Sequence, residues 1–277
     1  MTDTQAPDSP AQQWWHTDII DMRPGEIRYR GYPVEELIGN VGFADMVWLM
    51  TRGELPGRPQ AALLETALMS AVDHGPQAPS IAIARMAMTC GGSLNNAMAS
   101  AVNVLDDVHG GAGEQAVELY QSILERQIGG SDLETAVREG IADWQRQRTR
   151  IIPGFGHRFH PVDPRGPRLL ELVEAAAARG EVDGCFVAIA REVERQLIAM
   201  KGKPIPLNID GATAVIYAEL GFPAPLARGL FCLSRSVGIL AHAWEQQCQG
   251  GRNKGPIPKG WLWPYGGPDP RPVPQRD

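Results

Sequence analysis

Apolar residues recur at three- and four-residue spacing along almost the whole chain, and this periodicity restricts the possible folds more than any other feature. No segment with the alternating polarity of a half-buried strand competes with it. The pattern predicts an all-α protein, and no internal repeat is visible. The predicted helices cover residues 34–56, 58–75, 80–92, 93–108, 113–128, 131–148, 166–180, 182–200, 212–220 and 225–248.

Two of these segments and the two chain ends stand out. The segment 80–92 is apolar on almost all sides, which is typical of a central buried helix. The segment 93–108 begins with Ser93, a favoured N-cap residue, and its apolar residues fall on one face. We expect residues 1–16 to be flexible. The tail 253–277 is dense in proline and glycine and cannot form a long helix, so its aromatic residues either pack on the protein or extend from it.

The composition argues against several classes of protein. A net charge of −6 and a pI of about 5.6 do not suit a nucleic-acid-binding protein. No apolar run reaches the roughly 18 residues of a membrane span, and the N-terminus lacks the pattern of a signal peptide. The four cysteines are scattered without a CxxC pair, which suits reduced thiols. We therefore expect a cytoplasmic protein that binds neither nucleic acid nor membrane.

The polar residues that interrupt the helical pattern gather mostly at its boundaries. His74 lies in "VDHGPQ", His109 precedes two glycines, His157 follows "PGFG", and Asp210 opens an apolar helix. Arg235 is a lone charge within an otherwise apolar helix. Each also has a structural interpretation, since a histidine can close a helix, Asp210 can be an N-cap and Arg235 can be a paired buried ion.

As a set, these residues indicate a site for anionic substrates. Helix N-termini offer free N–H groups and a positive dipole end, and arginines grip carboxylates. The same field disfavours an imidazolium, so His109 is expected to be neutral and to donate a hydrogen bond. Asp210 is then the candidate general base. This arrangement suits proton abstraction next to a carbonyl group of a carboxylated substrate.

One pair of histidines raises the question of a metal site. His157 and His160 have the HxxH spacing that brings two imidazoles close together. No glutamate completes a known motif and the loop is rich in proline, so we expect no metal ion.

The motifs at these positions resemble those of the citrate synthase and citryl-CoA lyase family. The segment "EIRYRGYPVEELIGNVGFADMVWLMTRGELP" is similar to the family's N-terminal signature. The motifs "DHG", "HGGAGEQA", "GFGHR", "DPR", "NIDGATAVIYAELGFP" and "SRSVGILAH" then follow in family order. The likeness extends from about residue 20 to residue 250, and it is the combination of motifs that is specific.

The resemblance implies a role for each polar residue. His109 would hydrogen-bond the thioester carbonyl of acetyl-CoA, Asp210 would remove its methyl proton, and His157 would polarise the ketone of a 2-oxoacid such as oxaloacetate. Coenzyme A would thus enter as a thioester substrate, with no permanently bound cofactor. The residues expected to hold substrate carboxylates are His74, Arg165 and Arg235, and those expected to bind coenzyme A are Pro153, Gly154, Phe155, Gly156 and Arg158.

The resemblance also implies an all-α, citrate synthase-like fold in which a smaller helical domain is inserted into a larger one. The large domain would comprise residues 17–114 and 229–277, and the small domain residues 115–228. Closure of the small domain would exclude water from the enolate. Because the family forms dimers through helices, a homodimer is expected.

The chain departs from the family's synthases in two respects. It is much shorter, and Gly255-Pro256 stands where the synthases carry an Arg-Pro whose arginine reaches the partner's active site. Either Arg252 or Lys254 substitutes for this arginine, or the second carboxylate is not bound there. These features favour an enzyme of the citryl-CoA lyase type, which interconverts citryl-CoA with acetyl-CoA and oxaloacetate or a close analogue. The alternatives are a citrate or 2-methylcitrate synthase that releases free coenzyme A, and a catalytically silent subunit that binds coenzyme A.

Overall fold

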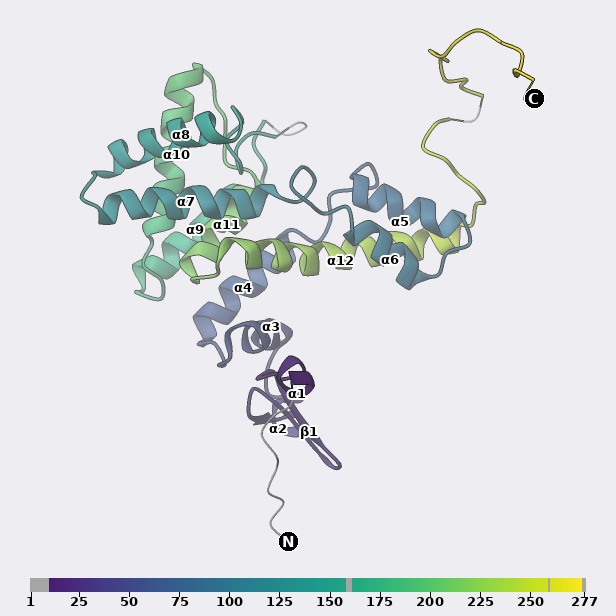
Figure 1. Ribbon diagram of the computed structural model, residues 1–277. Coiled ribbons are helices and arrows are strands. Elements are labelled where there is room, and N and C mark those ends of the chain that lie inside the picture. The colour runs from purple at the N-terminus through teal and green to yellow at the C-terminus, as the bar shows by residue number, and fades with distance from the viewer. Residues whose placement is uncertain (1–9, 158–160, 259, 276–277) are drawn as a thin grey trace.

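Helices make up nearly all of the regular structure in the computed structural model (Figure 1), which describes residues 10–157, 161–258 and 260–275. The prediction of an all-α fold is confirmed, apart from a small sheet near the N-terminus. The helices are α1 (Pro10–Trp14), α2 (Val34–Leu37), α3 (Phe43–Arg52), α4 (Arg58–Ser70), α5 (Pro79–Thr89), α6 (Leu94–Val102), α7 (Ala112–Ile128), α8 (Leu133–Gln147), α9 (Arg165–Ala178), α10 (Cys185–Lys201), α11 (Ile209–Glu219) and α12 (Ala224–Gln249).

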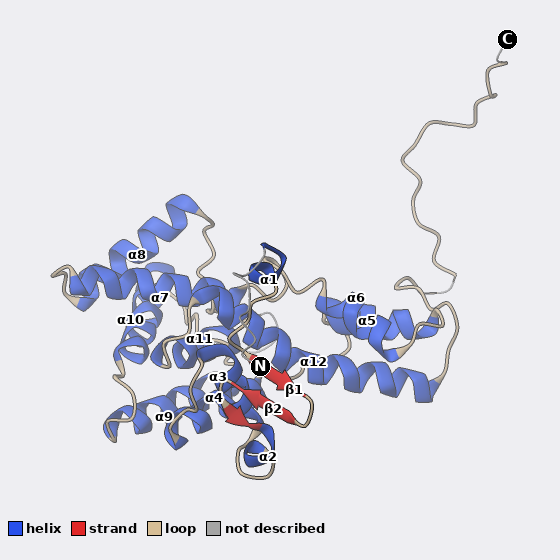
Figure 2. Cartoon of the chain, turned by 60° about the horizontal axis from the view of Figure 1, so that its bottom comes forward, coloured by secondary structure: helices blue, strands red, loops and turns tan. Residues whose placement is uncertain are grey.

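A short antiparallel sheet precedes α2 and was not expected from the sequence (Figure 2). Strands β1 (Ile20–Arg23), β2 (Glu26–Tyr29) and β3 (Tyr32–Pro33) pair in chain order. β1 is exposed throughout, so no alternation of buried residues exists to reveal it. The predicted helix 34–56 is likewise interrupted, because the chain turns between α2 and α3 through Gly39, whose φ is 82°.

The 26-residue helix α12 runs through the middle of the molecule and contacts helices at both of its ends (Figure 1). It packs on α4 and α7 along one part of its length and on α5 and α6 along another. It is long and apolar enough to meet the criteria for a membrane span, but 44% of the apolar window is buried inside the protein. Since core helices meet the same criteria, this is weak evidence for a span. The predicted domain boundary between residues 228 and 229 falls inside α12, so this helix would belong to both domains. The division into two domains stays a prediction.

α11 is the central helix of the group that contains α7, α9 and α10. Every residue of α11 from Ile209 to Ala218 is buried except Asp210, which is partly exposed. A short helix enclosed in this way is stabilised mainly by tertiary packing rather than by its own propensity. Its N-terminus, with Asp210, is thereby fixed relative to the surrounding helices.

α5 and α6 form a hairpin against α12 (Figure 1). Ser93 is the N-cap residue of α6 as predicted, although its side chain makes no capping hydrogen bond. In α6 Ala97 and Ala101 are fully buried, in agreement with the predicted apolar face. The expectation that α5 is buried on all sides is wrong for the described chain, because only one face meets α12 and α6. The buried residues of α5 are Ser80, Ile81, Ala84 and Thr89.

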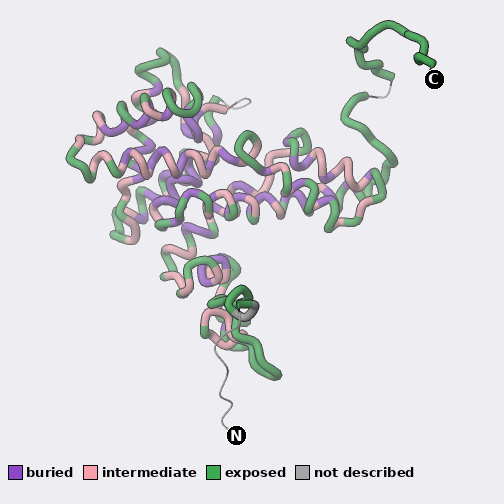
Figure 3. The backbone as a smooth tube through the Cα atoms, in the orientation of Figure 1, coloured by how far each residue is buried: buried purple, intermediate pink, exposed green. Residues whose placement is uncertain are grey.

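The first and last described segments, α1 and residues 260–275, lie on the outside of the molecule (Figure 3). Residues 1–9 of the segment predicted to be flexible lie outside the described residues, and α1 is a helix of five residues in which Trp14 is exposed. The C-terminal tail extends away from the helices, with Trp261, Leu262 and Trp263 between 72% and 90% exposed. Of the two expectations for the tail, the extended one therefore applies.

Candidate active site

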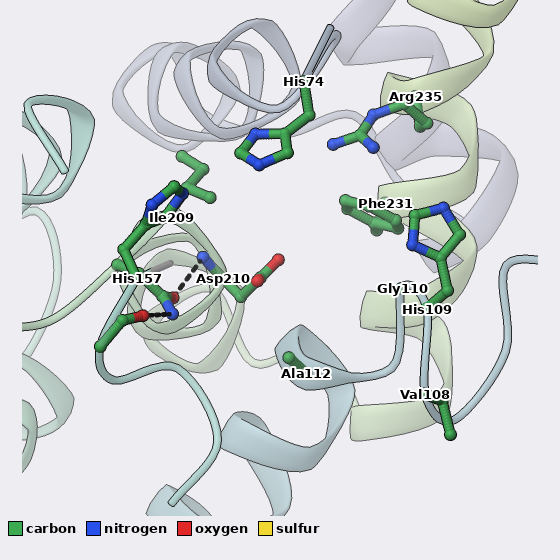
Figure 4. Close-up of a pocket in the computed structure, with 12 residues that line it drawn as sticks. His74, Val108, His109, Gly110, Ala112, His157, Ile209, Asp210, Phe231 and Arg235 are labelled. Atoms are coloured by element: carbon green, nitrogen blue, oxygen red, sulfur yellow. Dashed lines mark hydrogen bonds between the residues drawn. The ribbon is translucent and has the colours of Figure 1, made fainter. Parts of the chain in front are cut away.

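Side chains from five distant parts of the sequence line one cavity of about 270 Å³ (Figure 4). His74 follows α4, His109 precedes α7, His157 follows α8, Asp210 lies in the first turn of α11 and Arg235 lies within α12. The structure thus brings together five residues that the sequence pointed to separately. The other residues of the lining are Val108, Gly110, Ala112, Gly156, Asn208, Ile209 and Phe231.

His109 is held as a neutral hydrogen-bond donor by the N-terminus of α5. The backbone N–H of Ser80 donates to His109 Nε2 at 3.2 Å, and the Ser80 hydroxyl lies 3.0 Å from the same nitrogen. Because a backbone N–H can only donate, Nε2 is the acceptor and the hydrogen-bond network assigns the ring proton to Nδ1. Burial, and then the charge of Arg235, lower the pKa of His109 and favour the neutral ring. The proton on Nδ1 is therefore the one that the neutral ring can donate.

Ser80 was not identified from the sequence. It occupies the second position of α5, where a backbone N–H has no partner within the helix. The helix terminus that acts on His109 is therefore that of α5, and not the start of α7, which follows His109 in the chain. Pro79 does signal a helix start in the sequence, but the contact joins residues 29 positions apart and only the fold reveals it.

Asp210 directs its carboxylate into the cavity (Figure 4). Its N–H and that of Gly211 donate to Asn208 Oδ1 at 3.0 and 3.2 Å, so Asn208 is the N-cap of α11. The interpretation of Asp210 as an N-cap is thereby excluded. Although Asp210 is partly exposed to the cavity, the surrounding buried residues keep it out of bulk water, and this desolvation raises its pKa against the lowering effects of Arg235 and Arg165. A raised pKa makes a carboxylate a stronger base, which suits a group that takes and returns a proton.

The loop that carries His157 is hydrogen-bonded to the segment at the start of α11. The Gly156 N–H donates to Pro206 O at 2.8 Å, and the Asn208 amide donates to Gly156 O at 2.7 Å. Gly154 has a φ of 82°, and a Cβ at this residue would lie 2.5 Å from Gly211 Cα. Glycine at 154 is thus required by the close approach of two chain segments, whatever the loop binds.

The predicted coenzyme A residues differ in their accessibility. Pro153, Gly154 and Phe155 are buried, and within this set Gly156 reaches the cavity. Arg158 lies outside the described residues, so its role stays a prediction.

His74 and His157 lie side by side at one edge of the cavity. Their ring centroids are 5.3 Å apart with an edge-to-face orientation. Burial, followed by the charges of Arg165 and Arg235, lowers the pKa of His74. The lowered pKa favours the neutral form of His74, whose ring can donate a hydrogen bond to an anionic or polar ligand.

Arg165 is held in place by a carboxylate that the sequence analysis did not single out. Its Nε and Nη2 donate to the two oxygens of Asp163 at 3.0 and 2.9 Å. The Asp163 side chain is fully buried and also accepts the Ile209 N–H at 3.2 Å. Burial would raise the pKa of Asp163, but the hydrogen bonds from Arg165 lower it overall. Arg165 is not part of the cavity lining, and it acts on His74 and Asp210 through its charge.

Arg235 is 5% exposed and occupies the opposite wall. Its Nε donates to Ala71 O at 3.2 Å, and its guanidinium lies 4.9 Å from the centroid of the Phe231 ring. In Figure 4 the terminal nitrogens of Arg235 point towards His74. A buried guanidinium aimed into a cavity is suited to a carboxylate ligand.

The candidate substitutes for the missing arginine lie away from this cavity. The N–H groups of Asn253 and Lys254 bind Thr89 at the C-terminal end of α5, whereas Ser80 and His109 meet at its N-terminal end. Nine helical residues separate these ends by about 14 Å. Neither Arg252 nor Lys254 is among the residues that line the cavity.

Within the described ranges, no group of three or more histidine, cysteine, aspartate or glutamate side chains is arranged to hold a metal ion. His160, the second residue of the HxxH pair, lies outside the described residues.

Most of the chain matches the sequence pattern of one protein family. The sequence pattern of "Citrate synthase, C-terminal domain" matches residues 10–62 and 57–257. The chain belongs to the citrate synthase family. The family resemblance inferred from the motifs is therefore confirmed, and with it membership in a family of enzymes.

Among solved structures, the fold is similar to that of a citryl-CoA lyase from Hydrogenobacter thermophilus. The TM-score is 0.81 at 33% sequence identity, and the match covers 94% of this chain and 97% of that one. A citrate synthase from Acidithiobacillus ferridurans is 30% identical over 205 residues, which are 72% of this chain and 50% of the relative. ATP-citrate synthase subunit 1 of Sordaria macrospora is 28% identical over 247 residues, or 83% of this chain and 35% of the relative. The chain thus spans half or less of these two curated family members.

Proposed function

We propose that the protein is an enzyme of the citryl-CoA lyase type, which interconverts citryl-CoA with acetyl-CoA and oxaloacetate. The observation that carries this proposal is the placement of the Asp210 carboxylate and a neutral His109 in one cavity. Such a pair provides an acid–base group and a hydrogen-bond donor for an enolate. The match to the Hydrogenobacter thermophilus lyase over nearly the full length of both chains supports the lyase type.

In the cleavage direction, His157 takes the proton of the C3 hydroxyl of citryl-CoA and the C2–C3 bond breaks. The bond electrons pass to the thioester as an enolate, and C3 becomes the ketone carbon of oxaloacetate. Asp210, in its protonated form, gives its proton to C2, which becomes the methyl group of acetyl-CoA. Proton exchange with solvent restores both side chains. Condensation follows the same steps in reverse.

His109 stabilises the charge that develops on the thioester oxygen. The Ser80 N–H occupies Nε2, so the Nδ1–H is oriented towards the ligand without rotation of the ring. A donor fixed in advance costs no reorganisation when the enolate forms. The raised pKa of Asp210 complements this, because its protonated form is then accessible for the return of the proton.

The substrate carboxylates would bind on the side of the cavity formed by His74 and Arg235. Arg235 contributes a buried positive charge. Arg165, which lies outside the cavity lining, adds a second positive charge that lowers the pKa of His74. Coenzyme A would enter along the loop at Gly156, which lies at the cavity edge. Lys201 and Lys203 are exposed in the segment before Leu207, which pairs with Phe155 of this loop, so they are candidate contacts for coenzyme A phosphates.

We further propose that the protein acts as a cytoplasmic homodimer. The partly exposed face of α5 supports the dimer, because it offers apolar side chains such as Ala82, Ile83 and Met86 for packing against another helix. Light scattering coupled to size exclusion would yield about twice the chain mass of 30.1 kDa.

The decisive experiment is mass spectrometry of purified protein incubated with acetyl-CoA and oxaloacetate, following citryl-CoA, citrate and free coenzyme A together. Citryl-CoA without an equivalent of free coenzyme A is the expected result. Citrate with stoichiometric coenzyme A would instead identify a synthase. Failure to form either product, and failure to cleave synthetic citryl-CoA, would refute the proposed function.

A further inference from the structure

One face of α12 contacts residues 71–73, which lead directly into the cavity residue His74. The contacting positions of α12 are spaced by three and four residues and therefore lie on one side of the helix. Consecutive residues of the segment meet successive positions along α12. The contacts are Arg235 Nε to Ala71 O at 3.2 Å, Gly238 N–H to Val72 O at 3.1 Å, and His242 Nε2 to Asp73 Oδ1 and Oδ2 at 3.3 and 3.4 Å.

Gly238 permits this close approach. A Cβ at this position would lie 2.2 Å from Val72 O and 3.0 Å from Asp73 Oδ1. Any side chain here would push the segment away from α12. The segment is therefore held against the helix at its backbone as well as through side chains.

His242 has a defined donor direction. Arg85 Nη1 lies 3.4 Å from His242 Nδ1 and can only donate, so Nδ1 accepts and Nε2 carries the proton towards Asp73. Arg85 is itself held by Glu245 at 2.5 Å and by Gln249 at 2.7 Å. The ring of His242 is thus oriented from α5 and from the end of α12 together.

Asp73 connects this ring to the turn that carries His74. Its Oδ2 accepts the Gly75 N–H at 3.2 Å, which closes the turn around His74. Neither Asp73 nor His242 lines the cavity. His74 and Arg235, which do line it, face one another across its upper edge in Figure 4.

We propose that Asp73 and His242 are positioning residues that hold His74 at the separation from Arg235 at which both side chains bind one substrate carboxylate. The contact between His242 and Asp73 fixes the turn at His74, while Arg235 is fixed by Ala71 on the same helix face. This inference rests on the proposed function, because it assigns the acid substrate to these two residues. It extends that function to residues outside the cavity.

The test compares His242→Leu with His242→Gln in the full-length protein. Glutamine places an amide N–H near the position of Nε2 and an oxygen near Arg85, whereas leucine provides neither. For His242→Leu we expect the KM for oxaloacetate to rise on the order of 10-fold. The KM for acetyl-CoA should be unchanged and kcat should stay within a few fold of the wild type. The reason is that a displaced binding group weakens the binding of one ligand selectively. His242→Gln should restore the KM for oxaloacetate. Gln247→Leu, an exposed change on the same helix, is the matched control.

Asp73→Ala and the double variant Asp73→Ala/His242→Leu complete the design. Because the two residues act as one contact, the double variant should be no worse than the more affected single variant. An unchanged KM for oxaloacetate in His242→Leu would overturn the inference. So would equal losses in the leucine and glutamine variants together with a lowered melting temperature, since these would indicate a purely structural role.

Citrate binding by calorimetry separates this inference from the proposed function. A wild-type protein that binds citrate but does not turn over would contradict the proposed function alone, and weaker citrate binding by His242→Leu would still support the positioning role. An active wild type whose citrate affinity is identical in His242→Leu would contradict the positioning role alone.

Discussion

Replacing Asp210 with asparagine separates chemistry from folding at this site. The carboxylate makes no capping hydrogen bond, since Asn208 caps α11, and asparagine has almost the same shape. Loss of a general acid–base group costs about 10²–10⁴ in rate, or about 3–5 kcal/mol of transition-state stabilisation. We expect kcat to fall by this amount while the helical content remains that of the wild type.

The stability of this variant should change in the opposite direction from its activity. The pKa of Asp210 in the folded protein is raised by burial, so the folded state binds more protons than the unfolded state above the ordinary value of 3.8. The free energy of unfolding therefore falls as the pH rises through that window, and ionised Asp210 destabilises the fold at neutral pH. Asp210→Asn should melt at the same temperature as the wild type or higher at pH 7, with the difference disappearing below pH 4.

The assay for proton abstraction is deuterium incorporation into the acetyl-CoA methyl group in D₂O, followed by mass spectrometry. Asp210→Asn should lose this exchange, and Asp183→Asn, an exposed carboxylate change, should retain it. Normal exchange by a folded Asp210→Asn protein would refute the role of Asp210 as the base. A large drop in melting temperature would refute the view that its burial is unfavourable to folding.

Three further perturbations test the surroundings of the site. His109→Ala should lower kcat on the order of 10²–10³, as for the loss of one oxyanion donor, and a near-normal steady-state rate would place the thioester oxygen elsewhere. Gly211→Ala should destabilise the fold by about 1–3 kcal/mol in urea titrations, because the alanine Cβ would clash with the backbone oxygen of Gly154. Unchanged stability would show that the loop at Gly154 and the start of α11 can separate. Arg165→Met should cost about 3–5 kcal/mol at neutral pH, since it leaves the buried Asp163 carboxylate unpaired. Because the pKa of Asp163 is lowered in the folded state, this cost should shrink as the pH falls below 3.8, which melting curves at pH 3 and pH 7 would reveal.

The helical segments and several chemical groups could be predicted from local patterns. The apolar stripe of α6 was visible in the sequence, because periodicity acts over a few positions. His109, His157 and Asp210 were recognisable as candidates only as a set, because each alone also has a structural interpretation at a helix boundary. The exposed strand β1 and the break around Gly39 were missed, because they leave no periodic signal.

The partners of these groups were not predictable, because each contact joins positions far apart in the chain. Ser80 reaches His109 across 29 residues, and Asp73 reaches His242 across 169. Such pairs form only when two helices pack at one particular separation and with one particular rotation about their axes. Local sequence does not determine that rotation.

The sequence by itself therefore determined that the chain is helical and which side chains are the candidates for the chemistry. The tertiary structure decided how those side chains are tuned: the tautomer of His109 follows from the start of α5, and the raised pKa of Asp210 follows from its burial. Both depend on the dielectric environment and on donors supplied by other segments. The residue type sets the range of possible chemistry, and the packed neighbours select one protonation state within it.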